Sequence, residues 1–189
     1  KRIHIPSNVI KIGKYAFNKC INLISVQLPS NSNLHTVCKG AFQRSSISSI
    51  SFPSSIKMIE KYAFYRCKSL KKIEFPEFCE LQVFKKRLFF SSSLEYITIP
   101  SSIKKIEEDV FSFCMKLKSV NFSDSSQLEI IEKNAFSYSS LNFLSIPSNV
   151  SQIGIYAFHK CKNLETVEFP DDSKLTTISV YLFNNSSIK

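Results

Sequence analysis

Hydrophobic residues recur along this chain in a fixed order, and each copy of the pattern ends on a phenylalanine that usually follows an alanine. Successive phenylalanines are alternately 25 and 22 residues apart, so every second one lies 47 residues further on. Four units of 47 account for 188 of the 189 residues. The pattern predicts one array over residues 1–189, built of about eight repeats. The repeat phenylalanines are Phe17, Phe42, Phe64, Phe89, Phe111, Phe136, Phe158 and Phe183.

Each repeat has three predicted parts. The first is a short strand, as at 70–75, whose last two hydrophobic residues are two apart and therefore share a face. A proline follows, which lacks the N–H that strand pairing needs, and only Ser123 breaks this column of prolines. The second part is a turn with two inward hydrophobic residues three apart, as at 56–59. The third is a single helical turn, as at 64–67, whose end residues share a face.

A single repeat is too small to fold alone. Its roughly seven hydrophobic side chains contribute ~1.5 to 3 kcal/mol each on burial, whereas ordering costs ~1.5 kcal/mol for each of about 23 residues. Stacking overcomes this deficit, because neighbouring repeats pair their strands and join their hydrophobic faces into one core. Every repeat runs the same circuit, so the strands should be parallel and the coil right-handed. The predicted fold is an α/β solenoid with a concave sheet of about eight short strands and a convex side of short helical turns or irregular structure.

The repeat resembles a known family. The run Leu-x-x-Ile-x-Phe-Pro-x-x-x-Ile-x-x-Ile-x-x-x-Ala-Phe-x-x-Cys, seen at 47–67 and 141–161, is similar to the BspA-like (Treponema-type) leucine-rich repeat. That family comprises surface proteins of bacteria and of parasitic protozoa. The resemblance implies a leucine-rich-repeat horseshoe that is displayed outside the cell and binds host proteins, matrix or other microbes. Leu88, Val110 and Leu182 replace the alanine before the phenylalanine, which affects local packing and not the fold.

Both ends of the chain fall within a repeat, and we find no capping repeat of the kind that usually closes an array. We therefore expect an internal fragment of a longer protein, with any signal or anchor outside it. No hydrophobic run approaches the ~20 residues that a membrane-spanning helix needs.

Enzyme chemistry is not predicted. The chain has three histidines and three glycines, too few for a glycine-rich phosphate loop. The carboxylate groups at 107–109 and 171–172 lie in predicted loops without a hydrophobic pocket that would raise a pKa. Only His159 and Cys161 approach a base and nucleophile pair, and His159 should point outward because it follows the buried Phe158. We expect no catalytic, cofactor or metal site.

Four cysteines recur every 47 residues, with serine at the equivalent place in the intervening repeats. Like residues are two coils apart, roughly 9 to 10 Å, whereas a disulfide needs Cα atoms within about 7 Å. We predict a buried ladder of thiols and hydroxyls that satisfies backbone groups. Cys38 and Cys79 occupy other columns and are also expected to be free, although an extracellular location would permit disulfides. The ladder cysteines are Cys20, Cys67, Cys114 and Cys161.

The net charge of +10 is unevenly distributed. Residues 1–94 carry 16 Lys and Arg against 4 Asp and Glu, whereas residues 95–189 carry 9 against 11. Stacking should gather several cations into a basic stripe on the convex side. Such a stripe either keeps the array soluble or docks on an anionic glycan or phospholipid surface. Nucleic acid is not expected, since no recognised motif accompanies the charge. The predicted basic stripe is Lys14, Lys19, Lys39, Arg44, Lys61, Arg66 and Lys86.

The concave sheet is the predicted surface for a protein partner. Most of its outward positions are small and polar, but Tyr96 and Phe143 are aromatic residues of the kind enriched at binding hot spots. Alternatively, these two side chains only cover the sheet. Asn121, which lies on this face, is also one of several possible glycosylation sites. The candidate partner-binding residues are Lys72, Glu74, Tyr96, Thr98, Asn121, Phe143, Ser145, Thr166 and Glu168.

Three functions follow from these features. The first is a protein-binding scaffold at the cell surface, for adhesion or for host or microbe recognition. The second is a passive spacer in a long surface protein. The third is an intracellular interaction module, which the predicted free thiols favour.

Overall fold

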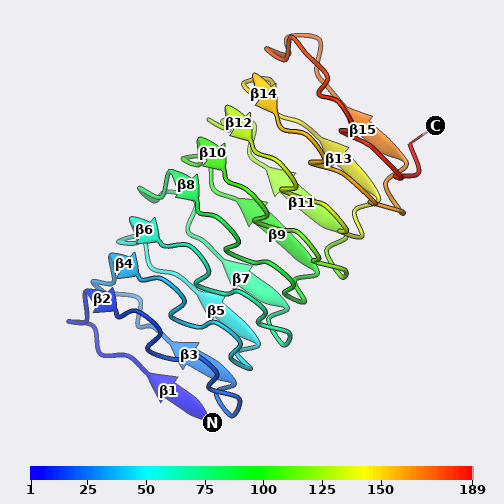
Figure 1. The fold of residues 1–189 in the computed structure, drawn as a ribbon. Coiled ribbons are helices and arrows are strands. Elements are labelled where there is room, and N and C mark those ends of the chain that lie inside the picture. The colour runs from blue at the N-terminus through cyan, green and yellow to red at the C-terminus, as the bar shows by residue number, and fades with distance from the viewer. Residues whose placement is uncertain (189) are drawn as a thin grey trace.

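The hydrophobic repeats stack in one direction in a computed structural model, which describes residues 1–188 (Figure 1). The chain passes repeatedly from one side of the stack to the other. Because successive coils are added in one direction, the two termini lie at opposite ends of the stack. Within the described residues the pass along one side contains eight parallel strands, which form the concave sheet. They are β1 (Arg2–His4), β3 (Ser25–Gln27), β5 (Ser49–Ser51), β7 (Lys72–Glu74), β9 (Tyr96–Ile99), β11 (Ser119–Phe122), β13 (Phe143–Ser145) and β15 (Thr166–Glu168). The predicted parallel solenoid is confirmed.

A second ladder of two-residue strands, also parallel, runs along the other edge of the stack. It coincides with the part of each repeat that the sequence indicated only as a turn. The second member of each pair is buried and the first is not, which places the hydrophobic residue inward. Within residues 1–188, three of the seven strands pair with both neighbouring coils and the other four pair with one. These strands are β2 (Lys11–Ile12), β4 (Thr36–Val37), β6 (Met58–Ile59), β8 (Val83–Phe84), β10 (Lys105–Ile106), β12 (Ile130–Ile131) and β14 (Gln152–Ile153).

The convex side is irregular, and residues 1–188 contain no helix. The helical turn predicted around each repeat phenylalanine is replaced by tight turns, because residues two before and two after it have φ between 54° and 63°. Tyr62 and Arg66 show the consequence. Their N–H groups donate to Lys86 O at 3.2 Å and Phe90 O at 2.8 Å, across to the next coil and not back along their own. Backbone hydrogen bonds between coils therefore form in place of the hydrogen bonds of a helical turn.

A spine of phenylalanine rings fills the centre of the stack. All eight repeat phenylalanines contribute, and neighbouring ring centroids lie 5.1 to 5.8 Å apart in stacked geometry. The six internal rings are fully buried, and the end rings Phe17 and Phe183 are partly buried. Leu88 and Val110, which replace the usual alanine beside the spine, are also fully buried. The core thus accepts larger side chains at these places without a change of fold.

Candidate protein-binding face

The concave sheet is divided into three hydrogen-bonded groups of strands within residues 1–188. Strands β1, β3, β5 and β7 form one group, β9 and β11 the second, and β13 and β15 the third. The breaks fall between β7 and β9 and between β11 and β13, where the strands are neighbours without ladder pairing. We call these two places the seams.

The spacing of the strands explains the seams. Equivalent positions on successive strands are alternately 23 and 24 residues apart, as in Ser49, Lys72 and Tyr96. Strands separated by 23 residues pair over three or four residues in register. Of the pairs separated by 24 residues, β3 and β5 share one residue pair and the other two form the seams. The extra residue in the connection therefore goes with weaker pairing, which is lost altogether at the seams.

A hollow lies over each seam. The β7–β9 hollow has a volume of about 430 Å³ and is lined by residues that include Lys72, Glu74, Phe75, Tyr96 and Thr98. The aromatic wall is accessible, since 44% of Tyr96 is exposed.

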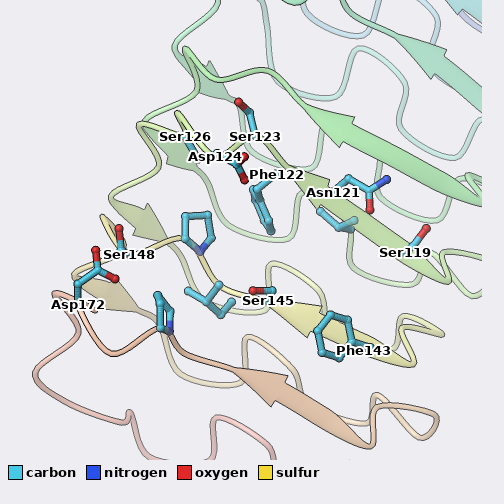
Figure 2. Close-up of a pocket in the computed structure, with 14 residues that line it drawn as sticks. Ser119, Asn121, Phe122, Ser123, Asp124, Ser126, Phe143, Ser145, Ser148 and Asp172 are labelled. Atoms are coloured by element: carbon cyan, nitrogen blue, oxygen red, sulfur yellow. The ribbon is translucent and has the colours of Figure 1, made fainter.

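The β11–β13 hollow is larger, about 580 Å³ (Figure 2). Phe122 and Phe143 give it hydrophobic walls, and Asn121 and Ser145 reach it from the neighbouring strands. Phe143 is 47% exposed. The two hollows meet at Ser123, which lines both. This serine replaces the proline that follows the other strands, so the gap in the proline column marks the junction of the hollows.

The two hollows differ in charge. In the β7–β9 hollow, Lys72 forms an ion pair with Glu74, which also accepts a hydrogen bond from Ser51. The hydrogen bond from Lys72, and then the one from Ser51, hold the pKa of Glu74 below its ordinary value. Glu77 also lines this hollow, which therefore holds one ammonium group and two carboxylates. The β11–β13 hollow contains the carboxyl groups of Asp124 and Asp172, and no Lys, Arg or His is among its lining residues in the described chain. It is therefore hydrophobic on its walls and acidic at its rim.

Seven of the nine predicted partner-binding residues lie in the hollows: Lys72, Glu74, Tyr96 and Thr98 in one, and Asn121, Phe143 and Ser145 in the other. Thr166 and Glu168 lie on β15 and line neither hollow. The sequence did not indicate the acidic rim, which Asp124 and Asp172 form from two different loops. The alternating strand spacing and the missing proline were the available signals for the hollows.

His159 and Cys161 do not form a base and nucleophile pair. The expectation that His159 points outward is wrong, because its ring is half-buried edge-on between Tyr138 and Tyr156, with centroids 5.5 and 5.3 Å away. Its Nδ1 atom is buried and has no hydrogen-bond partner in the described chain. Cys161 donates to Phe136 O at 3.1 Å. Burial raises the pKa of this thiol, which opposes nucleophilic chemistry.

The thiol and hydroxyl ladder has the predicted form. Cys67, Cys114 and Cys161 donate to the carbonyl oxygens of the spine phenylalanines one coil back, at 2.9, 3.1 and 3.1 Å. Each also lies beside the serine hydroxyl of that coil, at 3.3 to 3.7 Å. All six cysteines are free, including Cys38 and Cys79, and Cys20 at the start of the ladder is only partly buried. Residues 1–188 contain no cluster of His, Cys, Asp and Glu that could hold a metal ion.

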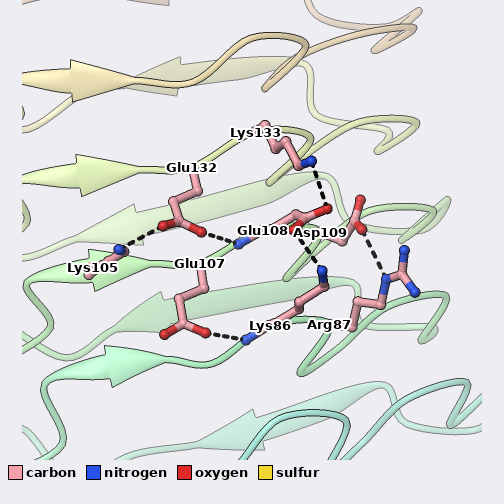
Figure 3. A network of polar contacts seen from close by, with 8 residues as sticks. All are labelled: Lys86, Arg87, Lys105, Glu107, Glu108, Asp109, Glu132 and Lys133. Carbon is pink, nitrogen blue, oxygen red and sulfur yellow. Dashed lines mark hydrogen bonds and ion pairs between the residues drawn. The ribbon is translucent and has the colours of Figure 1, made fainter.

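Lys86, the last residue of the basic stripe, is paired with a carboxylate (Figure 3). Lys86 Nζ lies 2.7 Å from Glu108, which also pairs with Lys133 at 3.2 Å. Burial alone would raise the pKa of Glu108, but its hydrogen bonds to the two ammonium groups outweigh this and lower it. Within residues 1–188, the other stripe residues form no ion pair. These are Lys14, Lys19, Lys39, Arg44, Lys61 and Arg66.

The stacked parallel coils with an inward hydrophobic repeat define a leucine-rich-repeat protein. The sequence model of the family described as the BspA type leucine rich repeat region matches residues 1–118 and 82–189, with six copies. The chain therefore belongs to this family. No curated protein matches the sequence. Residues 1–188 contain no helix that is long and hydrophobic enough to cross a membrane.

Solved structures share the fold. A leucine-rich repeat protein from Bacteroides ovatus is 24% identical with a TM-score of 0.71, over 88% of this chain and 48% of its own. The pneumococcal vaccine antigen PcpA is 30% identical with a TM-score of 0.68, over 91% of this chain and 41% of its own. The T. pallidum leucine-rich repeat protein is 25% identical with a TM-score of 0.72, over 90% of this chain and 78% of its own. The chain thus spans less than half the length of the first two structures.

Proposed function

We propose that this protein is a non-enzymatic scaffold that binds a protein partner through the concave sheet, in adhesion or in host or microbe recognition at a cell surface. The observation that carries the proposal is the pair of hollows at the seams, each with an exposed aromatic side chain on its wall. Aromatic residues that fill or line such hollows contribute most of the energy at many interfaces. The surrounding small polar side chains exclude water without binding strongly themselves.

The chemistry of the hollows indicates the kind of partner segment. The β11–β13 hollow suits a hydrophobic side chain against Phe122 and Phe143, next to a basic side chain near Asp124 and Asp172. The β7–β9 hollow holds the Lys72–Glu74 ion pair and the carboxyl group of Glu77, and it suits a second hydrophobic side chain against Tyr96. A protruding loop or extended segment with one basic and two hydrophobic residues meets both requirements.

The surface location rests on the family and on PcpA, which is a vaccine antigen. One observation favours an intracellular interaction module instead: all six cysteines are free, although oxidising compartments promote disulfides. Labelling intact cells with a reagent that does not cross membranes, followed by recovery of this protein, separates the two. A labelled protein supports the surface, and labelling only after lysis supports the intracellular module.

Loss of partner capture in a Tyr96→Ala, Phe143→Ala variant is the direct test. We expect the double variant to lose a partner that the unaltered chain recovers, because both truncated side chains are outside the core. Phe78→Ala is the control, since Phe78 is 78% exposed and lines neither hollow. Circular dichroism establishes that all variants are folded. Equal recovery by all three folded proteins would contradict binding at the hollows.

A further inference from the structure

The convex turns of the second and third repeats border an open hollow of about 310 Å³. Its lining residues are Arg44, Ser45, Ser46, Arg66, Lys68 and Ser69. Three cations and three residues with hydroxyl groups therefore meet at one place, without a carboxylate. Arg44, Arg66 and Lys68 form no ion pair within residues 1–188. We call this place the arginine hollow.

The backbone holds the two arginines side by side. Each follows a spine phenylalanine by two residues and has a left-handed conformation, with φ of 57° at Arg44 and 55° at Arg66. Their N–H groups donate to Tyr65 O and Phe90 O, both at 2.8 Å, which fixes the two turns in the same orientation. The spine rings of these coils are 5.2 Å apart. Two guanidinium groups are thus placed one coil apart at equivalent positions, where each repels the other unless an anion lies between them.

The same place in later repeats has a different chemistry. Two 47-residue units further on, Tyr138 stands at the position of Arg44, and Lys160 and Lys162 stand at those of Arg66 and Lys68. There Lys160 Nζ donates to Tyr138 Oη at 2.9 Å and lies 5.0 Å from the centre of its ring. That cation has a partner within the protein. In the arginine hollow, the Arg66 guanidinium group also lies over a ring, 5.3 Å from the centre of that of Tyr65. Unlike Lys160, however, Arg66 and Arg44 donate no side-chain hydrogen bond and form no ion pair within residues 1–188, so their N–H groups are available to a ligand.

We propose that the arginine hollow binds a sulfate group of a linear sulfated polysaccharide, which runs along the convex side of the first three repeats. A guanidinium group donates two parallel hydrogen bonds to a tetrahedral oxyanion, and the serine hydroxyls can donate to the remaining oxygen atoms. The other stripe cations continue the site in two rows along the stacking axis, at the coil spacing of 5.1 to 5.2 Å. A line of charge with this repeat fits a chain with regularly placed sulfates, whereas a membrane presents a plane of head groups.

The test uses heparin as the probe and a matched pair of double variants. Arg44→Ser with Arg66→Ser removes two charges from the arginine hollow, and Lys160→Ser with Lys162→Ser removes two from the equivalent hollow in the later repeats. We expect the arginine variant to bind heparin about tenfold more weakly in isothermal titration, and the lysine variant to remain within about twofold of the unaltered chain. Equal losses in both variants, or none in the arginine variant, would overturn the proposal.

Further measurements identify the class of anion and separate this site from the concave face. Unsulfated hyaluronan, vesicles with phosphatidylserine and duplex DNA are titrated under the same salt conditions. We expect all three to bind more weakly than heparin, and stronger binding by vesicles or DNA would overturn the polysaccharide assignment. The Tyr96→Ala, Phe143→Ala variant should retain heparin binding. If it does not, the arginine hollow is not an independent site.

Discussion

Replacing one central spine ring should cost far more stability than replacing the first ring. Phe136 is fully buried and stacks on both neighbours, with centroids 5.1 Å from Phe111 and 5.6 Å from Phe158. Truncating such a phenylalanine to alanine removes the transfer energy and leaves a cavity, together about 3 to 5 kcal/mol. Phe17 is partly exposed and, within residues 1–188, stacks on one ring, that of Phe42, at 5.1 Å. We expect Phe17→Ala to cost about 1 to 2 kcal/mol, since a fully buried side chain contributes ~1.5 to 3 kcal/mol.

Urea unfolding followed by far-ultraviolet circular dichroism measures both free energies. Because each coil contacts only its neighbours, the array behaves as a chain of nearest-neighbour interfaces. Phe136→Ala should therefore also broaden the transition, as the coils on its two sides begin to unfold separately. Equal destabilisation by the two substitutions, or less than about 1 kcal/mol at position 136, would refute the stacked spine as the source of stability.

Three smaller predictions follow from single contacts. Gly154→Ala should lower the urea midpoint, because an added Cβ would lie 2.5 Å from a backbone nitrogen of the previous coil. Gly13→Ala, in the same column, is the control: its added Cβ meets nothing within 4 Å and should leave the urea midpoint unchanged. Burial raises the pKa of Cys67 to about 12 from the ordinary 9.0, so the neutral thiol stabilises the fold fully below pH 9, and this stabilisation is lost as pH rises toward 12. In a Cys67→Ala variant, the melting temperature should therefore fall less steeply with rising pH over this range. The ion pairs that lower the pKa of Glu108 stabilise the fold above its unfolded value near 4.5, and this contribution is lost as pH falls through the folded pKa. Glu108→Gln should therefore cost up to about 1 kcal/mol at pH 7 and progressively less as the pH falls through the folded pKa, and a cost that does not change with pH would exclude the ion pairs as the cause.

The strands, the spine and the thiol ladder could be predicted because each repeats a residue type at a fixed interval. When Cys67 and Cys114 recur 47 residues apart in a stack, they must have the same surroundings, and one inference serves for all members of the column. The two-residue strands could not be predicted in this way. A pair such as Lys11 and Ile12 is too short to show the alternation that distinguishes a strand from a turn.

The helical turn was a plausible but wrong choice, since residues three apart share a face both in a helix and in a pair of tight turns. The deciding feature is the left-handed backbone at positions such as Tyr62 and Arg66. A glycine in the sequence is the usual sign of this conformation, but among the residues that adopt it here Gly40 is the only glycine. The buried side of His159 could not be predicted from its own repeat, because one of the two rings that cover it, that of Tyr138, comes from the neighbouring coil.

The hollows could not be predicted from the residues that every repeat shares, because they form where one repeat differs from the next. The extra residue between alternate strands and the serine at 123 are each a single change in an otherwise regular pattern. Their effect appears only when the coils are placed side by side, because a hollow is formed by two coils together. The charge of the arginine hollow follows the same rule, since Arg44 and Arg66 come from successive repeats.

Site-specific photocrosslinking tests the central claim, that partners bind in the hollows of the concave sheet. A photoreactive phenylalanine analogue is placed at Phe143 in one protein and at the more exposed Phe78 in another, and each is irradiated with the captured partner. We predict a covalent complex with the protein altered at Phe143 and none with the protein altered at Phe78. A complex formed only from Phe78 would place the partner elsewhere and contradict the claim.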